Sequence, residues 1–139
     1  MPVDAVLARI LDGLHSGGFT DLVPAHLSVL RYPGPQGRRP TEVAAESRMS
    51  KQAVNYLLKQ LEELGYLTRT GDERDQRSKR IQLTARGLAA AKNIRATVRR
   101  IEREWRRELG EERFADLQQL LVDLNGTNLV RKHQARSPY

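Results

Sequence analysis

The sequence predicts a mainly α-helical domain that carries one small β-hairpin, and three observations lead to this prediction. Apolar residues recur at helical spacing through most of the chain. Between residues 66 and 83 the apolar period shortens to two, which is typical of strands. Aromatic residues make up only 5% of the 139 positions, so the core must be built from Leu, Val, Ile and Ala, a mixture that suits packed helices. This length fits one domain, residues 1–139.

Two helices are predicted in the N-terminal part of the chain. The first follows a stripe of apolar residues at helical spacing, namely Val6, Leu7, Ile10, Leu11 and Leu14. Gly17 and Gly18 weaken or end this helix. Pro24 suits the first position of a second helix, where its missing N–H has no cost. A loop rich in Pro and Gly follows at residues 33–37.

A helix–turn–helix is the strongest local signal in the sequence. Thr41 is a capping candidate for a short third helix that runs through Glu46. After three more residues, Ser50 can cap a longer helix whose apolar period continues to Leu64. Gly65 follows the last apolar residue, where a left-handed C-cap is common. The longer helix is therefore bounded at both ends.

A β-hairpin is predicted directly after this helix. Residues 66–70 and 79–83 have the pattern of short strands, and residues 71–77 form a polar turn between them. Thr84 can then cap a long helix. A helix–turn–helix followed by a hairpin is the element order of a winged helix-turn-helix, in which the hairpin is the wing.

The C-terminal part is predicted to form two helices separated by Gly110. Apolar positions of the long helix lie 3, 3, 4, 3 and 4 residues apart, a spacing that suits a narrow coiled-coil-like seam. They are Leu88, Ala91, Ile94, Val98, Ile101 and Trp105. Burying this seam and the stripes of the first and last helices needs more surface than one short chain offers, so we expect a homodimer. Residues 1–20 and 88–139 are the expected dimerisation helices, and residues 24–87 the winged helix-turn-helix.

The charge balance favours a polyanionic partner. Lys and Arg total 24 against 17 Asp and Glu, which gives a net charge of +7, so nucleic acid is the first expectation and an acidic membrane the second. Cysteine is absent, which excludes disulfides, thiolate zinc sites and Cys nucleophiles. The sequence has no recognisable secretory signal and no apolar run near the ~18 residues that cross a bilayer. We therefore expect a cytoplasmic protein without a membrane partner.

The helix that starts at Ser50 has an outer face that suits the major groove of DNA. If its apolar positions face the core, the opposite face presents Ser50, Lys51, Gln52, Asn55 and Tyr56. Gln and Asn can pair with adenine through two hydrogen bonds, Lys can reach guanine or phosphate, and Ser can bond phosphate. The alternative is an ordinary solvated helix face.

The hairpin tip carries a cluster of cations, namely Arg74, Arg77, Lys79 and Arg80. Arginine at a loop tip suits a narrow minor groove, where the negative potential is enhanced. Asp75 cannot contact DNA favourably, so we expect it to orient Arg77 or Arg74 through a charge-assisted hydrogen bond. The alternative is a charged turn that keeps the protein soluble.

Catalysis is not expected from this sequence. His15, His26 and His133 are scattered without metal-ligand spacing, and the motifs H-E-x-x-H and G-x-S-x-G are absent. No glycine-rich phosphate loop is present either. We therefore predict no enzyme activity, no cofactor and no metal site.

Four sequence motifs occur together between residues 41 and 88. They are Met49–Val54, Leu61–Leu67, Asp72–Arg77 and Leu83–Gly87. In order and spacing they resemble the MarR family of bacterial transcription regulators. The wing motif and the Leu-Thr-x-x-Gly entry to the next helix are the most discriminating parts, because helix–turn–helix segments occur in many regulators.

The resemblance implies a homodimer that places one winged helix on each half of a pseudo-palindromic operator, in most such proteins as a repressor. The residues that it assigns to the recognition helix in the major groove are Ser50, Lys51, Gln52 and Asn55. It places Arg74 and Arg77 on the wing arginines and Asp75 on the acid that holds the wing. A winged helix that docks a protein and never reads DNA is the alternative from another class.

The resemblance also implies release from DNA by a small phenolic or aromatic acid that binds between the dimerisation and DNA-binding regions. The candidates to line such a cleft are His15, His26, Arg31 and Tyr32, with a structural role as the alternative for each. Val23 stands where the family commonly has a capping Thr, so the second helix is expected to start less sharply. Without cysteine, the peroxide-sensing branch of the family is excluded.

Overall fold

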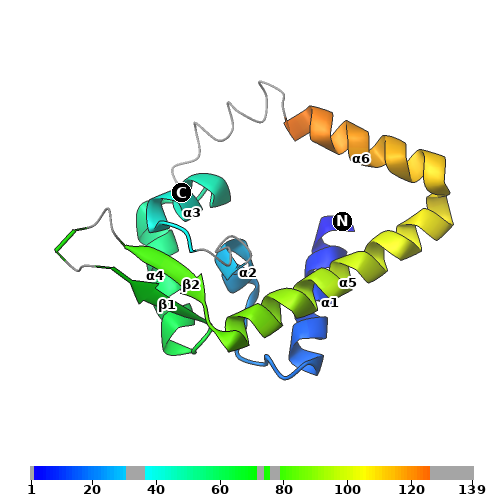
Figure 1. The fold of residues 1–139 in the computed structure, drawn as a ribbon. Coiled ribbons are helices and arrows are strands. Elements are labelled where there is room, and N and C mark those ends of the chain that lie inside the picture. The colour runs from blue at the N-terminus through cyan, green and yellow to red at the C-terminus, as the bar shows by residue number, and fades with distance from the viewer. Residues whose placement is uncertain (1, 31–36, 72–73, 76–78, 126–139) are drawn as a thin grey trace.

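The computed structural model of the chain describes residues 2–30, 37–71, 74–75 and 79–125 and has mostly helical structure with one two-stranded hairpin (Figure 1). In chain order the elements are α1 (Pro2–Ser16), α2 (Pro24–Leu30), α3 (Pro40–Ser47), α4 (Lys51–Glu63), β1 (Leu67–Thr70), β2 (Arg80–Leu83), α5 (Ala85–Leu109) and α6 (Glu111–Asn125). This order confirms the predicted fold class. None of the helices in the described ranges combines the length and the apolar composition needed to span a membrane.

Helices α2, α3 and α4 pack together with the hairpin around one apolar core. α4 lies against both α2 and α3 and contributes the buried residues Val54, Leu57, Leu58 and Leu61. Leu67 and Ile81 of the hairpin and Leu14 of α1 join the same core. Burial of this apolar stripe holds one face of α4 against the core and leaves its other face in solvent.

Two predicted helix caps are confirmed. The Ser50 hydroxyl accepts a hydrogen bond from the N–H of Ala53 at 3.1 Å, at the start of α4. The Thr84 hydroxyl accepts one from the N–H of Gly87 at 3.1 Å, at the start of α5. Each cap satisfies a backbone N–H that has no partner within its helix.

The predicted cap of the third helix is wrong. α3 begins at Pro40, so Thr41 lies within its first turn, and the N-cap residue is Arg39, whose side chain makes no capping hydrogen bond. Proline has no N–H to satisfy, and its fixed φ suits the first helical turn, so the helix starts one residue before Thr41. At the other end Arg48 has a left-handed φ of +62°, which makes the tight turn into Ser50.

The end of α4 determines where the hairpin begins. Gly65 has a φ of +87°, and the N–H groups of Gly65 and Tyr66 donate to the carbonyls of Glu62 and Leu61 at 3.1 and 2.9 Å. This pair of bonds is a Schellman motif, as the glycine predicts. Because the N–H of Tyr66 is used by the helix end, the first strand starts at Leu67, one residue later than predicted.

The hairpin is antiparallel, with Leu67 of β1 opposite Leu83 of β2. Arg38, just before α3, forms a bridge with Ile81: the two residues exchange N–H···O bonds of 3.0 and 2.7 Å. The base of the hairpin is therefore tied to the segment that leads into α3.

α5 packs against α1, and small and polar residues take part in this contact. A Cβ atom at Gly13 would lie 2.6 Å from the Thr97 hydroxyl oxygen, so glycine permits the close approach. Asn93 donates from Nδ2 to the Gly13 carbonyl at 3.1 Å. Along the predicted apolar seam, Ala91 and Ile101 are buried within the chain, whereas Leu88 is 46% exposed, so its place in a dimer seam stays a prediction. The buried position is the preceding Gly87, and the next side chain points about 100° away.

Three side chains, which we call the Asp21 clamp, join the winged region to α5. The Tyr66 hydroxyl donates to Asp21 Oδ1, and Arg86 donates to Asp21 Oδ2 at 3.0 Å. The Arg86 guanidinium also lies 4.3 Å from the centroid of the Tyr66 ring. Burial alone would raise the pKa of Asp21, but the hydrogen bond from Tyr66 and the charge of Arg86 outweigh it and lower the pKa. Burial and the neighbouring Asp21 raise the pKa of Tyr66, so its hydroxyl keeps its proton.

Candidate nucleic-acid interface

The outer face of α4 presents polar side chains to solvent. Lys51, Gln52 and Asn55 are exposed. In the described ranges no hydrogen bond or ion pair engages the side chains of these three residues. Ser50 differs, because it is half-buried and its hydroxyl oxygen holds the cap. The predicted polar face therefore offers two amides and one ammonium group to a ligand, next to the N-terminus of the helix.

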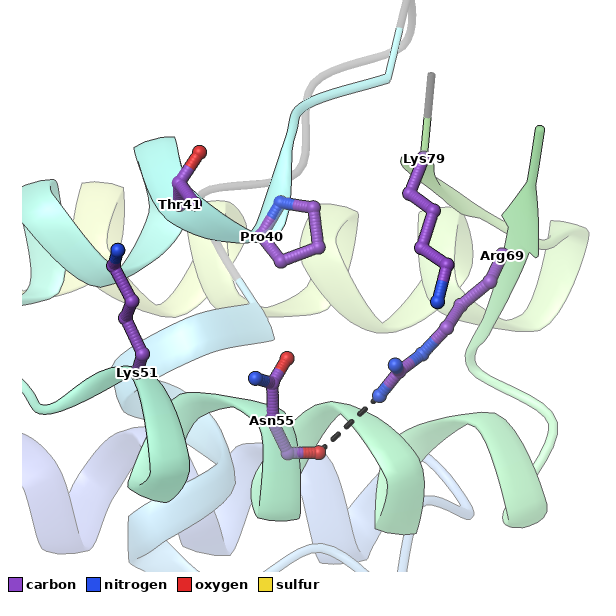
Figure 2. A pocket seen from close by; sticks show the side chains of 6 residues that line it. All are labelled: Pro40, Thr41, Lys51, Asn55, Arg69 and Lys79. Carbon is purple, nitrogen blue, oxygen red and sulfur yellow. Dashed lines mark hydrogen bonds between the residues drawn. The ribbon is translucent and has the colours of Figure 1, made fainter. Parts of the chain in front are cut away.

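A pocket of about 270 Å³ lies between the start of α4 and the hairpin. The residues that line it are Pro40, Thr41, Lys51, Asn55, Arg69 and Lys79. In Figure 2 the amide of Asn55 points into this pocket from α4, and the ammonium of Lys79 points into it from the hairpin side. The fold thus brings two of the predicted helix residues, Lys51 and Asn55, and one predicted hairpin cation, Lys79, to the same pocket.

Arg69 links the hairpin to α4, although the sequence reasoning did not single it out. Its Nη2 donates to the backbone carbonyl of Asn55 at 3.2 Å (Figure 2), and its Nε lies 3.7 Å from a carboxylate oxygen of Glu62. The signal was available, because Arg69 stands two residues after the buried Leu67 and strand alternation puts both on the face toward α4. Thr41, taken as a cap, lines the pocket instead.

Arg80 forms an ion pair with a carboxylate of α3. Its Nη1 lies 3.9 Å from Glu42 Oε1, and Glu42 also lies 3.4 Å from Arg38, which pairs with Glu46 as well. The carboxylates of α3 therefore offset part of the positive charge at the hairpin base. Lys79 forms no ion pair within the part of the chain that the structure describes, so its charge remains available.

The remaining predicted DNA contacts are exposed or lie outside the described residues. Arg74 and Asp75 are exposed at the hairpin tip, whereas Arg77 lies outside the described residues, so the orienting contact of Asp75 stays a prediction. Tyr56 is 64% exposed on α4, and its hydroxyl oxygen accepts a hydrogen bond from Gln60 Nε2 at 3.1 Å.

Two of the four ligand-binding candidates, His15 and His26, lie in the described part of the chain. His15 Nε2 is 3.0 Å from the carbonyl oxygen of Leu22, a contact that holds the connection between α1 and α2. Arg31 and Tyr32 lie outside the described residues. A pocket of about 150 Å³ lies between α1, α2 and α5, and its lining includes neither histidine. The lining residues are Leu7, Ile10, Pro24, Leu27, Ser28 and Ile94.

His26 makes a side-chain contact at the start of α2, where Val23 has no capping group of its own. Its Nδ1 accepts a hydrogen bond from the N–H of Val23 at 3.1 Å, and its Nε2 lies 3.1 Å from Gln60 Oε1 on α4. The ring is only 4% exposed. Both ring nitrogens thus hold α2 in place, which is the structural alternative given for this residue.

The α3–turn–α4 unit, the hairpin and the exposed polar face of α4 together define a winged helix-turn-helix protein. Residues 20–78 match the sequence model of the MarR family. No protein of curated function matches the chain in sequence.

Solved structures of MarR regulators have the same fold. A MarR family transcription regulator aligns with a TM-score of 0.72 at 16% identity, over 97% of this chain and 87% of that one. FabT of Streptococcus pneumoniae, solved in complex with DNA, aligns with a TM-score of 0.75 at 22% identity, over 88% and 86%. CouR of Rhodococcus jostii RHA1, bound to p-coumaroyl-CoA, aligns with a TM-score of 0.66 at 25% identity, over 88% and 82%. The family match and the shared fold support a MarR-family winged-helix protein, as the motifs predict.

Proposed function

We propose that this protein binds double-stranded DNA sequence-specifically as a homodimer and represses transcription from a pseudo-palindromic operator. The observation that carries the proposal is the outer face of α4, where the side chains of Lys51, Gln52 and Asn55 are exposed without internal partners among the described residues. Two of them, Lys51 and Asn55, line a pocket together with Lys79. One protein of the same fold, FabT, is solved in complex with DNA.

The two parts of this surface have different tasks on DNA. Gln52 and Asn55 carry amides that can pair with adenine in the major groove, and Lys51 can reach guanine or phosphate. Lys79 and Arg80 at the base of the wing contact the backbone, which fixes the register without reading sequence. Further out, Arg74 and Arg77 enter the minor groove, with Asp75 as the orienting acid.

Exposed apolar residues on α6 support the homodimer. Leu120, Leu121 and Leu124 are each more than half exposed. α6 packs chiefly against α5 and follows the end of α5 that is distant from the hairpin (Figure 1). A contiguous apolar stripe of this kind is typical of an association surface. We therefore assign residues 1–20 and 88–139 to dimerisation and residues 24–87 to DNA binding.

We place a small aromatic or phenolic effector in the cleft between α1, α2 and α5. The side chains that line the pocket there are apolar apart from Ser28, and the pocket measures about 150 Å³, a volume in which a single aromatic ring can bind. CouR is solved with p-coumaroyl-CoA, whose p-coumaroyl group belongs to this class of ligand although the CoA thioester as a whole is larger. Neither His15 nor His26 lines this pocket, so Arg31 and Tyr32, which lie outside the described residues, remain the candidates for its polar contacts.

Selection of bound duplexes from random-sequence DNA, followed by footprinting, tests this function. We expect a two-fold symmetric footprint whose half-sites lie about 10–10.5 bp apart, centre to centre. Sedimentation at micromolar concentration should give a dimer. A single unpaired half-site, or a monomer, would contradict the proposed assembly.

The competing function is that of a module that docks another protein. Such a module needs apolar anchors at the centre of its contact surface, and the outer face of α4 instead carries Lys51, Gln52 and Asn55. Protein complexes that persist at high salt, with no duplex selected, would favour this alternative.

A further inference from the structure

A chain of three hydrogen bonds runs from the start of α2 to the exposed face of α4. The N–H of Val23 donates to His26 Nδ1, and His26 Nε2 contacts Gln60 Oε1. Gln60 Nε2 then donates to the Tyr56 hydroxyl oxygen. The donor–acceptor distance is 3.1 Å in each bond. His26 is 4% exposed and Tyr56 is 64% exposed. The chain thus connects the buried core to the surface that we propose meets DNA.

The backbone N–H of Val23 sets the direction of every bond in this chain. A backbone N–H can only donate, so His26 Nδ1 must be an unprotonated acceptor. The neutral ring then carries its proton on Nε2, and this N–H donates to Gln60 Oε1. The amide oxygen of Gln60 is therefore held toward His26, and its NH₂ group is held toward Tyr56.

The same chain leaves the Tyr56 hydroxyl with one defined function. Its oxygen already accepts from Gln60, so its own proton turns away from Gln60 and toward solvent. We propose that His26 and Gln60 are positioning residues that make Tyr56 a hydrogen-bond donor toward DNA. This inference rests on the proposed DNA-binding function. The partner of Tyr56 is an acceptor atom of DNA, either a phosphate oxygen or an acceptor at a base edge in the major groove.

Substitution of Gln60 by glutamate reverses the bond to Tyr56 without removing the bond to His26. A carboxylate accepts hydrogen bonds only, so it still accepts from His26 Nε2, but it also draws the Tyr56 proton inward. Tyr56→Phe removes the hydroxyl altogether. Both changes therefore remove the same outward donor, by different routes.

A double-mutant cycle separates the loss of the Tyr56 donor from the negative charge that Gln60→Glu adds. The cycle uses the full-length protein and a duplex selected by the wild type. We expect Tyr56→Phe to weaken DNA binding by about three- to tenfold. Gln60→Glu should cost at least as much in the wild-type background, but clearly less in the Tyr56→Phe background, where only charge repulsion remains. The thermal unfolding midpoint of each variant should stay close to that of the wild type. Tyr56 is exposed, and the carboxylate in Gln60→Glu still accepts from His26 Nε2.

The selectivity of the Tyr56→Phe variant identifies the acceptor. A uniform loss across duplexes assigns a phosphate contact, and a loss of preference at one base pair assigns a base contact. Either result supports the donor. If affinity is unchanged in Tyr56→Phe, or if the two substitutions have strictly additive effects, the inference is wrong while the proposed function stands.

The tautomer of His26 gives a test that needs no DNA. The ring nitrogens in a long-range ¹H–¹⁵N spectrum of the protein should report a neutral ring protonated at Nε2. A ring protonated at Nδ1 would overturn the inference. If the wild type selects no duplex at all, the proposed function fails and the DNA part of the inference fails with it, even where the tautomer is as expected.

Discussion

The Asp21 clamp and the outer face of α4 are both polar, but their side chains are used differently. In the clamp, the carboxylate of Asp21 accepts hydrogen bonds from Tyr66 and Arg86. On α4, the side chains of Lys51 and Asn55 are exposed and have no partner in the described ranges. Polar groups that are satisfied within the fold maintain its geometry, whereas free donors on a rigid helix are available to a ligand. Substitutions in the first region should therefore lower stability, and substitutions in the second should lower DNA affinity.

The largest loss of stability is expected from a substitution at Gly87, beside the Asp21 clamp. A Cβ atom there would lie 1.9 Å from the carbonyl oxygen of Tyr66, so α5 would have to move away from the end of α4. We expect Gly87→Ala to lower the free energy of unfolding by about 3 kcal/mol, measured by urea denaturation. Ala89→Ser, which adds one atom at an exposed position of α5, is the control and should be nearly neutral. Equal stability of the two variants would contradict the close packing.

Asn55→Ala tests the contribution of the outer face of α4 to DNA affinity. We expect a loss of about 2 kcal/mol in DNA binding and a relaxed preference at one base pair, because a two-pronged contact to adenine is removed. Stability should change little, since Arg69 bonds to the backbone carbonyl of Asn55 and keeps that contact. Thr68→Ala, exposed on β1, serves as the control. A large loss of stability with unchanged DNA binding would reverse the roles given to the two regions.

Asp21→Asn should lower stability by about 1 kcal/mol at neutral pH, because the clamp is only partly buried. The pKa of Asp21 is lowered in the folded protein, so its stabilising contribution is complete above about pH 4 and is lost as the pH falls through the folded-state pKa. The variant should therefore lose part of the acid-dependent destabilisation. Urea denaturation at pH 7 and pH 3 measures this, and identical pH profiles would rule out the clamp as a source of acid sensitivity.

The smallest effects on DNA binding are expected from substitutions of Lys79 and Arg80 at the base of the wing. Lys79→Ala should reduce the salt dependence of DNA binding by about one unit of log–log slope. Arg80→Ala should reduce it less, because Glu42 already offsets part of the Arg80 charge. The pair is compared by titrating duplex at several salt concentrations. If Arg80→Ala has the larger effect, the α3 carboxylates do not offset its charge on DNA.

The sequence predicted the parts of the fold that depend on local chemistry. Ser50, Gly65 and Thr84 each act through neighbours within a few residues, so their capping positions could be recognised from the pattern alone. The polar face of α4 was likewise predictable, because the apolar period fixes which side is buried. Thr41 was the exception, where two adjacent residues both suit a helix start and Pro40 takes the first position.

Features that depend on contacts between distant segments were not predictable in the same way. The pairing of Asp21 with Arg86 joins residues 65 positions apart, and the contact of His26 with Gln60 spans 34 positions. The exposure of Leu88 also depends on the approach of the preceding Gly87 to Tyr66. Only tertiary packing brings these groups together, so composition and periodicity give no signal for them.

The most direct test is the affinity of the wild-type protein for a selected duplex as a function of salt concentration. If cations on α4 and the wing neutralise several phosphates, log K should fall linearly with log[salt], with a slope of about −0.9 per phosphate contact. A slope of several units, reduced by Lys51→Ala and Lys79→Ala, is the expected result. Binding that does not respond to salt, or no binding in dilute buffer, would contradict a winged helix that holds double-stranded DNA.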